Sequence, residues 1–428
     1  MQMRGNALKR ETAGFLAVLG GVLVGLSVLL AACEWRVQYQ EARGFWADDF
    51  FVIPIDNGRA IRILSYMGND TELQIPSLID KLPVTYIGSM AFPNRNLTSV
   101  TIPNTVRIIG AAAFARNQFT GGVVIPNSVV CIGRDAFRST QLSSLTIGDG
   151  LALIESRAFS ENQLAELVLP DSVTTIESFA FYGNQLTKLT IGSGIVTVSG
   201  SAFSQNRLAS ITIPASVATI GPSAFAGNEI VSIDIQEGVA RIGDLAFERN
   251  KLSSLVIPDS VVSIGAGAFA VNFLDSIVIP YGITQIEDGT FRENRLAKVY
   301  IPNSVTAIGS WAFEHNLLTR LAIPDSVDII QVGAFENNDI IEITIGWNVS
   351  LETRHGRGAF PHGFDDFYRE HGSRAGTYTF DGEQWHVEFR RFPLPKHAET
   401  GVFHFHNIDI LPMTWYNSSI DWCVHCSV

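Results

Sequence analysis

The chain has 428 residues, a formal net charge of −12 at pH 7 and a hydrophobic content of 46%. This hydrophobic content is ample for a packed core, and the acidic balance argues against a nucleic-acid partner, which requires a basic stripe on the protein. Four cysteines in a chain of this length are too few for a disulfide framework.

Residues 1–32 are predicted to be a signal peptide. Cationic residues precede an apolar run from about residue 13 to residue 30, and the run ends at Leu30-Ala31-Ala32-Cys33. This tetrapeptide resembles a bacterial lipobox, whose cysteine becomes the lipidated first residue after cleavage. An uncleaved membrane helix is the alternative, because the run is close to the roughly 18 residues that span a bilayer. The small residues before Cys33 favour a lipoprotein, and we therefore expect an extracytoplasmic protein with a lipid anchor in a membrane.

Residues 33–50 are predicted to be a tether or linker, and residues 51–90 an N-terminal cap with a degenerate first repeat. Alternating isoleucines flank Asp56-Asn57-Gly58. Because Asn and Gly accept positive φ, this pattern predicts a β-hairpin. An atypical sequence is expected here, since a terminal unit must close the apolar end of a repeat array.

Residues 88–349 form an array of 22-residue repeats, which is marked by regularly spaced phenylalanines. Every step between them is 22 residues except one of 23: Phe92, Phe114, Phe137, Phe159, Phe181, Phe203, Phe225, Phe247, Phe269, Phe291, Phe313 and Phe335. A short strict period is typical of a solenoid, in which each unit buries its apolar face only against its neighbours.

The sequence of one repeat predicts two short segments whose apolar side chains face inward. After Phe203, Ile211 and Ile213 alternate with polar residues, which is the period of a strand, and Pro214 then ends it. Val217 and Ile220 supply a second short inward-facing pair. The remaining length leaves room for one helical or 3₁₀ turn but not for a full helix.

Ten of the twelve units carry an asparagine three residues after the phenylalanine. They are Asn117, Asn162, Asn184, Asn206, Asn228, Asn250, Asn272, Asn294, Asn316 and Asn338, with Arg95 and Thr140 at the two exceptions. A binding row is one interpretation. We favour a structural ladder instead, because an inward amide satisfies backbone groups at a bend that no regular ladder reaches.

The order Asn-x-Leu-x-x-Leu-x-Ile-Pro-x-Ser-Val-x-x-Ile-Gly-x-x-Ala-Phe resembles the BspA-like leucine-rich repeat family of bacterial surface and secreted proteins, over about residues 50–390. Family members often carry Cys at the Asn position. The resemblance implies a mostly β, curved leucine-rich repeat solenoid with a parallel sheet on one face, short turns or 3₁₀ pieces on the other and a cap at each end. It also implies adhesion or host interaction, without specifying a ligand.

The outward strand positions, seven and nine residues after each phenylalanine, form the natural recognition surface. Most are small hydroxyl or β-branched residues, which an exposed sheet favours in any case. Lys298, Tyr300 and Arg320 are the exception and lie on adjacent units. They form a possible contact patch, with an ordinary solvated face as the alternative.

Residues 350–390 are predicted to be a C-terminal cap. Residues 364–372 indicate a short helix that ends at a glycine, and Asp381-Gly382 indicates a hairpin. Asp365, Asp366 and His371 could suggest acid and base groups. Adjacent carboxylates on a helix point to different sides, however, and a charged cap surface is the better interpretation.

Residues 391–428 form a His- and Cys-containing tail of unknown role. Cys423, His425 and Cys426 are weak candidates for zinc ligands, since a structural site would need a second pair at suitable spacing. In an exported protein, Cys423 and Cys426 more often form a disulfide or remain reactive.

No phosphate loop, zinc-protease motif or serine elbow occurs in the sequence. We therefore expect no catalytic residues, no enzyme activity and no cofactor. The prediction is a non-enzymatic scaffold for protein-protein or adhesive interactions at the bacterial cell surface, with a protein, matrix or envelope partner. The alternative is a structural or assembly protein of the envelope.

Overall fold

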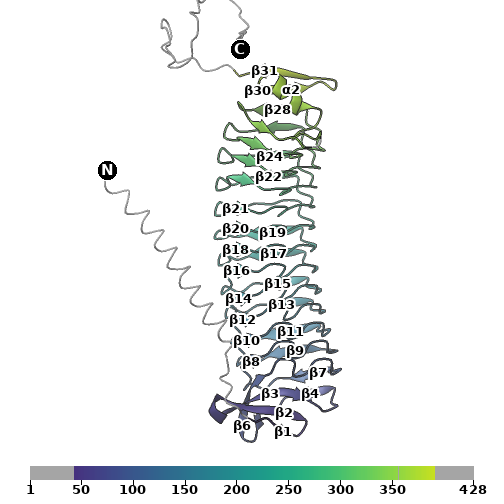
Figure 1. The fold of residues 1–428 in the computed structure, drawn as a ribbon, viewed down its shortest axis with the longest axis vertical. Coiled ribbons are helices and arrows are strands. Elements are labelled where there is room, and N and C mark those ends of the chain that lie inside the picture. The colour runs from purple at the N-terminus through teal and green to yellow at the C-terminus, as the bar shows by residue number, and fades with distance from the viewer. Residues whose placement is uncertain (1–42, 355, 391–428) are drawn as a thin grey trace, which may run out of the picture. The chain divides into compact units, whose positions relative to one another are not determined.

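The structure is a computed structural model that describes residues 43–354 and 356–390. The predicted signal peptide, most of the tether and the C-terminal tail lie outside the described residues. Described residues up to Phe389 belong to one compact unit, in which short coils follow one another along a stack (Figure 1). The described part of the chain contains no helix with the length and hydropathy needed to cross a membrane.

An antiparallel hairpin closes the N-terminal end of the array. Strands β1 (Phe45–Ala47), β2 (Phe50–Ile55) and β3 (Ala60–Tyr66) pair in order, and the 3₁₀ turn η1 (Asp56–Gly58) joins β2 to β3. Strand β3 then pairs in parallel with β6 (Leu82–Ile87), which in turn pairs with β5 (Leu78–Ile79). The hairpin thus passes directly into the parallel stack.

The first strand of each repeat lies on one side of the coil, and these strands pair mostly in twos. The pairs are β4 (Glu72–Gln74) with β7 (Ser99–Thr101), β9 (Gly122–Ile125) with β11 (Ser144–Ile147), β13 (Glu166–Val168) with β15 (Lys188–Thr190), β17 (Ser210–Ile213) with β19 (Ser232–Ile235), β22 (Ser276–Val278) with β24 (Lys298–Tyr300), and β26 (Arg320–Ala322) with β28 (Glu342–Ile345). All these pairs are parallel and in register. We call this row the first ladder.

The second strand of each repeat has only two residues but forms the longer sheet. Its members are β8 (Ile108–Ile109), β10 (Cys131–Ile132), β12 (Leu153–Ile154), β14 (Thr175–Ile176), β16 (Thr197–Val198), β18 (Thr219–Ile220), β20 (Arg241–Ile242) and β21 (Ser263–Ile264), followed in a separate sheet by β23 (Gln285–Ile286), β25 (Ala307–Ile308), β27 (Ile329–Ile330) and β29 (Ser350–Leu351). From β6 to β21 the ladder is unbroken. The two-stranded pieces of the first ladder and this second ladder are the two columns of strands in Figure 1.

The core is a column of stacked rings. All twelve repeat phenylalanines are fully buried, and Phe360 extends the column by one ring. Neighbouring ring centroids from Phe92 to Phe360 are 5.0–5.9 Å apart. The predicted solenoid, whose interior is shared between neighbouring units, is confirmed.

The bend around each phenylalanine is formed of turns, one of the two predicted forms. Among the described residues the only 3₁₀ segment is η1, outside the array. Residues two before and two after each phenylalanine instead have φ between 51° and 69°. In the coil of Phe225, this alternation lets Ser223, Phe225 and Gly227 donate their backbone N–H groups to the next coil at 2.8–2.9 Å. A continuous 3₁₀ helix would direct these three groups within their own coil, so the bonds between coils favour turns over a 3₁₀ piece here.

Helix α2 (Phe364–Glu370) and the hairpin of β30 (Gly376–Phe380) and β31 (Trp385–Phe389) close the C-terminal end. Strand β30 pairs antiparallel with β28 and thereby ends the first ladder. The rings of Phe364 and Phe360 are 5.0 Å apart, which places the helix over the end of the core column.

Candidate interaction surface

The asparagine row lies inside the stack. The Asn206 side-chain amide donates to the carbonyl groups of Phe181 and Phe203, at 3.0 and 3.1 Å, while its oxygen accepts from the Leu186 N–H at 3.0 Å. The same pattern recurs from Asn162 to Asn338, and each of these side chains is buried. Because these amides are enclosed and hydrogen-bonded, they face no ligand.

At Thr140, one of the two positions without an asparagine, a side-chain hydroxyl makes part of these hydrogen bonds. The Thr140 Oγ1 donates to the Phe137 carbonyl at 2.9 Å and lies 2.8 Å from the Asn162 Oδ1. In place of an asparagine oxygen, the Thr140 backbone carbonyl accepts the Phe119 N–H of the preceding coil at 2.9 Å. At the other exception, the Arg95 backbone N–H donates to the Asn117 Oδ1 at 3.0 Å.

The outward positions of the first ladder are solvent-exposed, and the predicted contact residues come together there. Lys298 and Tyr300 both belong to β24, and Arg320 lies on β26. The Arg320 guanidinium is 3.7 Å from a Glu342 carboxylate oxygen, whereas Lys298 makes no ion pair among the described residues.

Three apolar side chains enlarge this group. Val278 is in register with Tyr300, Val256 occupies the equivalent position one coil earlier, and Tyr281 lies in the turn after β22. Inspection of the outward strand positions missed Tyr281, because this residue lies in a turn beyond the end of β22. We call the complete set the C-terminal patch: Val256, Val278, Tyr281, Lys298, Tyr300 and Arg320.

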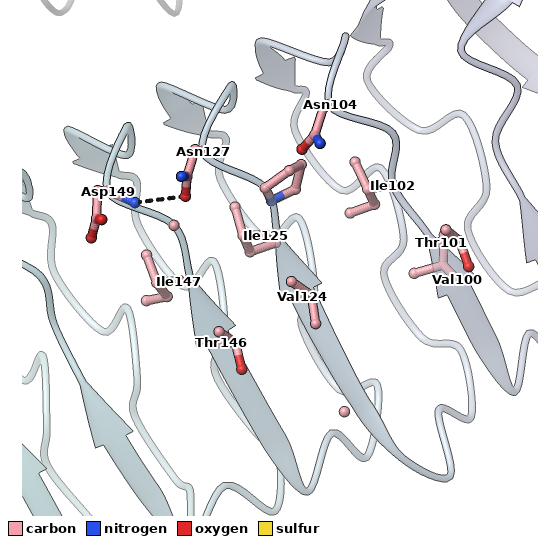
Figure 2. A pocket seen from close by; sticks show the side chains of 13 residues that line it. Val100, Thr101, Ile102, Asn104, Val124, Ile125, Asn127, Thr146, Ile147 and Asp149 are labelled. Carbon is pink, nitrogen blue, oxygen red and sulfur yellow. Dashed lines mark hydrogen bonds between the residues drawn. The ribbon is translucent and has the colours of Figure 1, made fainter.

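A hollow of about 560 Å³ lies near the other end of the first ladder. Figure 2 shows Val124 and Thr146 on neighbouring strands, with Asn127 and Asp149 in the turns beyond them. The Asp149 N–H donates to the Asn127 Oδ1 at 3.1 Å. Gly122, beside the one-residue insertion, lines the hollow, and a β-carbon at this position would collide with the Ser144 hydroxyl. No aromatic side chain lines it, and Asp149 is its one charged residue.

The acidic residues of the C-terminal cap serve its structure. Burial raises the pKa of Asp365, although the backbone N–H groups of Ala359 and Phe360 donate to its carboxylate at 2.7 and 3.0 Å. Asp366 is paired with Arg369, and the His371 ring lies within 2.8 Å of the Phe367 carbonyl. These groups do not converge on a common point.

The remaining chemical candidates are not tested by this geometry. Cys33, Cys423, His425 and Cys426 lie outside the described residues. Within residues 43–354 and 356–390, no group of three or more His, Cys, Asp or Glu side chains could hold a metal ion.

The stack, its two ladders and its open sheet face define a β-solenoid repeat scaffold. The repeat sequence identifies the family. The family model of the BspA type leucine-rich repeat region, with six copies, matches residues 85–207, 153–273, 197–317 and 241–356. The chain belongs to this family, as the repeat order predicts.

Two of three similar solved structures, those from Bacteroides ovatus and pneumococcus, support the same fold. A leucine-rich repeat protein from Bacteroides ovatus is 23% identical, with a TM-score of 0.58 over 71% of this chain and 89% of that protein. The pneumococcal vaccine antigen PcpA is also 23% identical, with a TM-score of 0.50 over 72% of this chain and 82% of PcpA. A leucine-rich cell surface protein from Faecalibacterium prausnitzii is 26% identical, with a TM-score of 0.46 over 74% and 99% of the two chains. No curated protein matches the chain.

Proposed function

We propose that this protein is a non-enzymatic, extracytoplasmic scaffold that binds another protein through the outer face of its first ladder. Membership of the BspA type family supports a repeat scaffold. The lipobox-like Leu30-Ala31-Ala32-Cys33 supports a lipid anchor at the bacterial cell surface.

The observation that carries the proposal is the contrast between the two sides of each first-ladder strand. The inward side repeats the same aliphatic residues, such as Ile211 and Ile277, and is buried. The outward side changes from coil to coil, and in the coil between β19 and β22, where no first-ladder strand forms, the equivalent position holds Val256, which is 82% exposed. Sheet propensity accounts for a single β-branched residue at such a position, but not for apolar side chains exposed on successive coils, and their continuity favours recognition of a partner.

Binding can be tested with the full chain in detergent, labelled with a fluorophore and titrated onto immobilised, purified matrix and envelope proteins. We expect saturable binding to at least one protein, competed by unlabelled chain and retained after residues 391–428 are deleted. The deletion leaves the compact unit that ends at Phe389 intact. Absence of saturable binding, or binding that requires the tail, would refute the scaffold function and favour an assembly role.

The anchor requires a separate test. We expect the wild-type chain to incorporate radiolabelled palmitate and to fractionate with membranes in a bacterial host that processes lipoproteins. Cys33→Ala should abolish labelling, because it removes the thiol that carries the lipid, and the variant should accumulate as a larger, unprocessed precursor. Unchanged membrane retention without labelling in the wild type would indicate the uncleaved helix instead.

A further inference from the structure

We infer that the C-terminal patch binds an extended protein segment that carries apolar side chains together with carboxylates. The inference rests on the proposed protein-binding function. It adds the location of the contact and the chemistry of the partner.

The first argument is the continuity of apolar exposure. Val256, Val278 and Tyr300 occupy the same outward position on three successive coils and are 82%, 65% and 53% exposed. Tyr281, at the adjoining turn, is 66% exposed. Earlier in this column Val124 and Val168 are each flanked by polar neighbours, so only the C-terminal patch offers an uninterrupted apolar strip in the described array. A contiguous exposed strip of this kind typically marks an interaction site.

The second argument is the tyrosine pair. The Tyr281 hydroxyl lies near that of Tyr300 and raises the pKa of Tyr300. Both rings are more than half exposed, so each offers an apolar face together with a hydroxyl that can donate to a partner oxygen.

The third argument is charge. In a chain with a net charge of −12, Lys188 and Lys251 are neutralised by Glu166 and Glu229, at 2.7 and 2.9 Å. Lys298, by contrast, lies beside the apolar strip without an ion pair among the described residues. The Arg320 side chain is 73% exposed and only loosely paired, at 3.7 Å. These two cations favour a partner with carboxylates beside its apolar groups.

The dimensions favour a polypeptide. Four coils at about 4.8 Å spacing give a strip of roughly 15 Å, which matches four to five residues of extended chain at about 3.3 Å each. An acidic polysaccharide would supply carboxylates but no aliphatic side chains for Val256 and Val278. The apolar half of the patch therefore favours the protein segment over the polysaccharide.

The repeat provides a matched control for the test. Lys298→Glu with Val278→Ser changes the patch, while Lys188→Glu with Val168→Ser makes the same two changes at the same repeat positions 110 residues earlier. Val278 and Val168 are almost equally exposed, at 65% and 64%. Circular dichroism melting of both double variants checks that each is folded.

A library of 12-residue peptides displayed on phage is panned on the full chain, and the selected peptides are synthesised for titration. We expect enrichment of Asp and Glu next to aromatic or aliphatic residues. The K298E/V278S variant should bind these peptides at least about tenfold more weakly, the effect of losing one interface hot spot, whereas K188E/V168S should bind like the wild type.

Equal binding by the two double variants, or selected peptides without acidic enrichment, would overturn the inference. Competition by hyaluronate with the same dependence on Lys298 and Val278 would assign the patch to a polysaccharide and would also overturn it. If a protein of the panel binds both double variants alike, the patch inference fails while the scaffold function stands. If peptides depend on the patch but no panel protein binds, the patch inference stands, while binding to the matrix and envelope proteins of the panel fails.

Discussion

The side-chain amide of Asn206 donates a 3.0 Å hydrogen bond to the backbone carbonyl of Phe181 in the preceding coil. Phe181 also accepts from Asn184 of its own coil, at 3.1 Å. From Phe159 to Phe313, each phenylalanine carbonyl is therefore bonded twice, once by the asparagine of its own coil and once by that of the next coil. The Leu186 N–H, unlike these carbonyls, depends on one partner, the side-chain oxygen of Asn206.

We therefore expect Asn206→Ala to lower the free energy of unfolding by about 2 kcal/mol, because it leaves the buried Leu186 N–H without a partner. Urea denaturation followed by circular dichroism measures the change. Asn303→Ala, at an exposed turn, is the matched control and should change stability by less than about 0.5 kcal/mol. Equal effects of the two substitutions would contradict a structural role for the row.

The ring column supports a second prediction. Phe225 is fully buried and stacks on Phe203 and Phe247, with centroids 5.6 and 5.4 Å away. Phe225→Ala should cost about 3–5 kcal/mol, because it opens a cavity between three coils. Phe273→Ala removes a ring that is 41% exposed and should cost far less. A small loss for Phe225→Ala in the same denaturation assay would mean that the column does not hold the stack together.

The sequence predicted these inward columns because burial imposes one residue type at a fixed period, as at Phe225 and Asn206. It did not predict the left-handed positions. Residues such as Leu245, Val271 and Trp311 occupy them, and none of these residue types indicates a left-handed turn. Hydrogen bonds to the next coil impose this backbone on whatever side chain is present. The second ladder was also underestimated, since two residues carry too little alternation to indicate a strand.

The sequence predicted only part of the candidate site. Lys298, Tyr300 and Arg320 stand out because the outward position is usually a small residue. Tyr281 belongs to a turn, and only folding brings it beside Tyr300. The sequence also could not distinguish Lys298 from Lys188, because the difference between them is an ion pair to Glu166 across two coils.

Val271 leads to a third prediction. Its φ is 57°, a conformation that a β-branched residue adopts only under strain, whereas Asn tolerates it well. Val271→Asn should therefore stabilise the protein by roughly 1 kcal/mol. Val262→Asn provides the control, because Val262 is exposed but is absent from the left-handed positions, and it should give no gain. Thermal melting of both variants decides the question, and destabilisation by Val271→Asn would show that the position is not strained.

Asp365 gives a prediction about pH. Burial raises the pKa of this carboxyl, so the folded protein keeps a proton that the unfolded chain loses first. Its contribution to stability is therefore present below the ordinary carboxyl pKa of about 4 and declines as the pH rises toward the raised value in the folded state. Asp365→Asn removes this titration. The stability of the wild type minus that of Asp365→Asn should then fall as the pH increases above about 4.

The measurement is a series of urea denaturation midpoints between pH 4 and pH 7. Asp366→Asn, next along α2, reports the general effect of removing one negative charge from this helix, because its side chain is 81% exposed. If the two variants differ from the wild type by the same amount at every pH, burial of Asp365 does not control its protonation. A decline found only for Asp365→Asn would instead identify the cap as the part of the fold that loses stability as this carboxyl ionises.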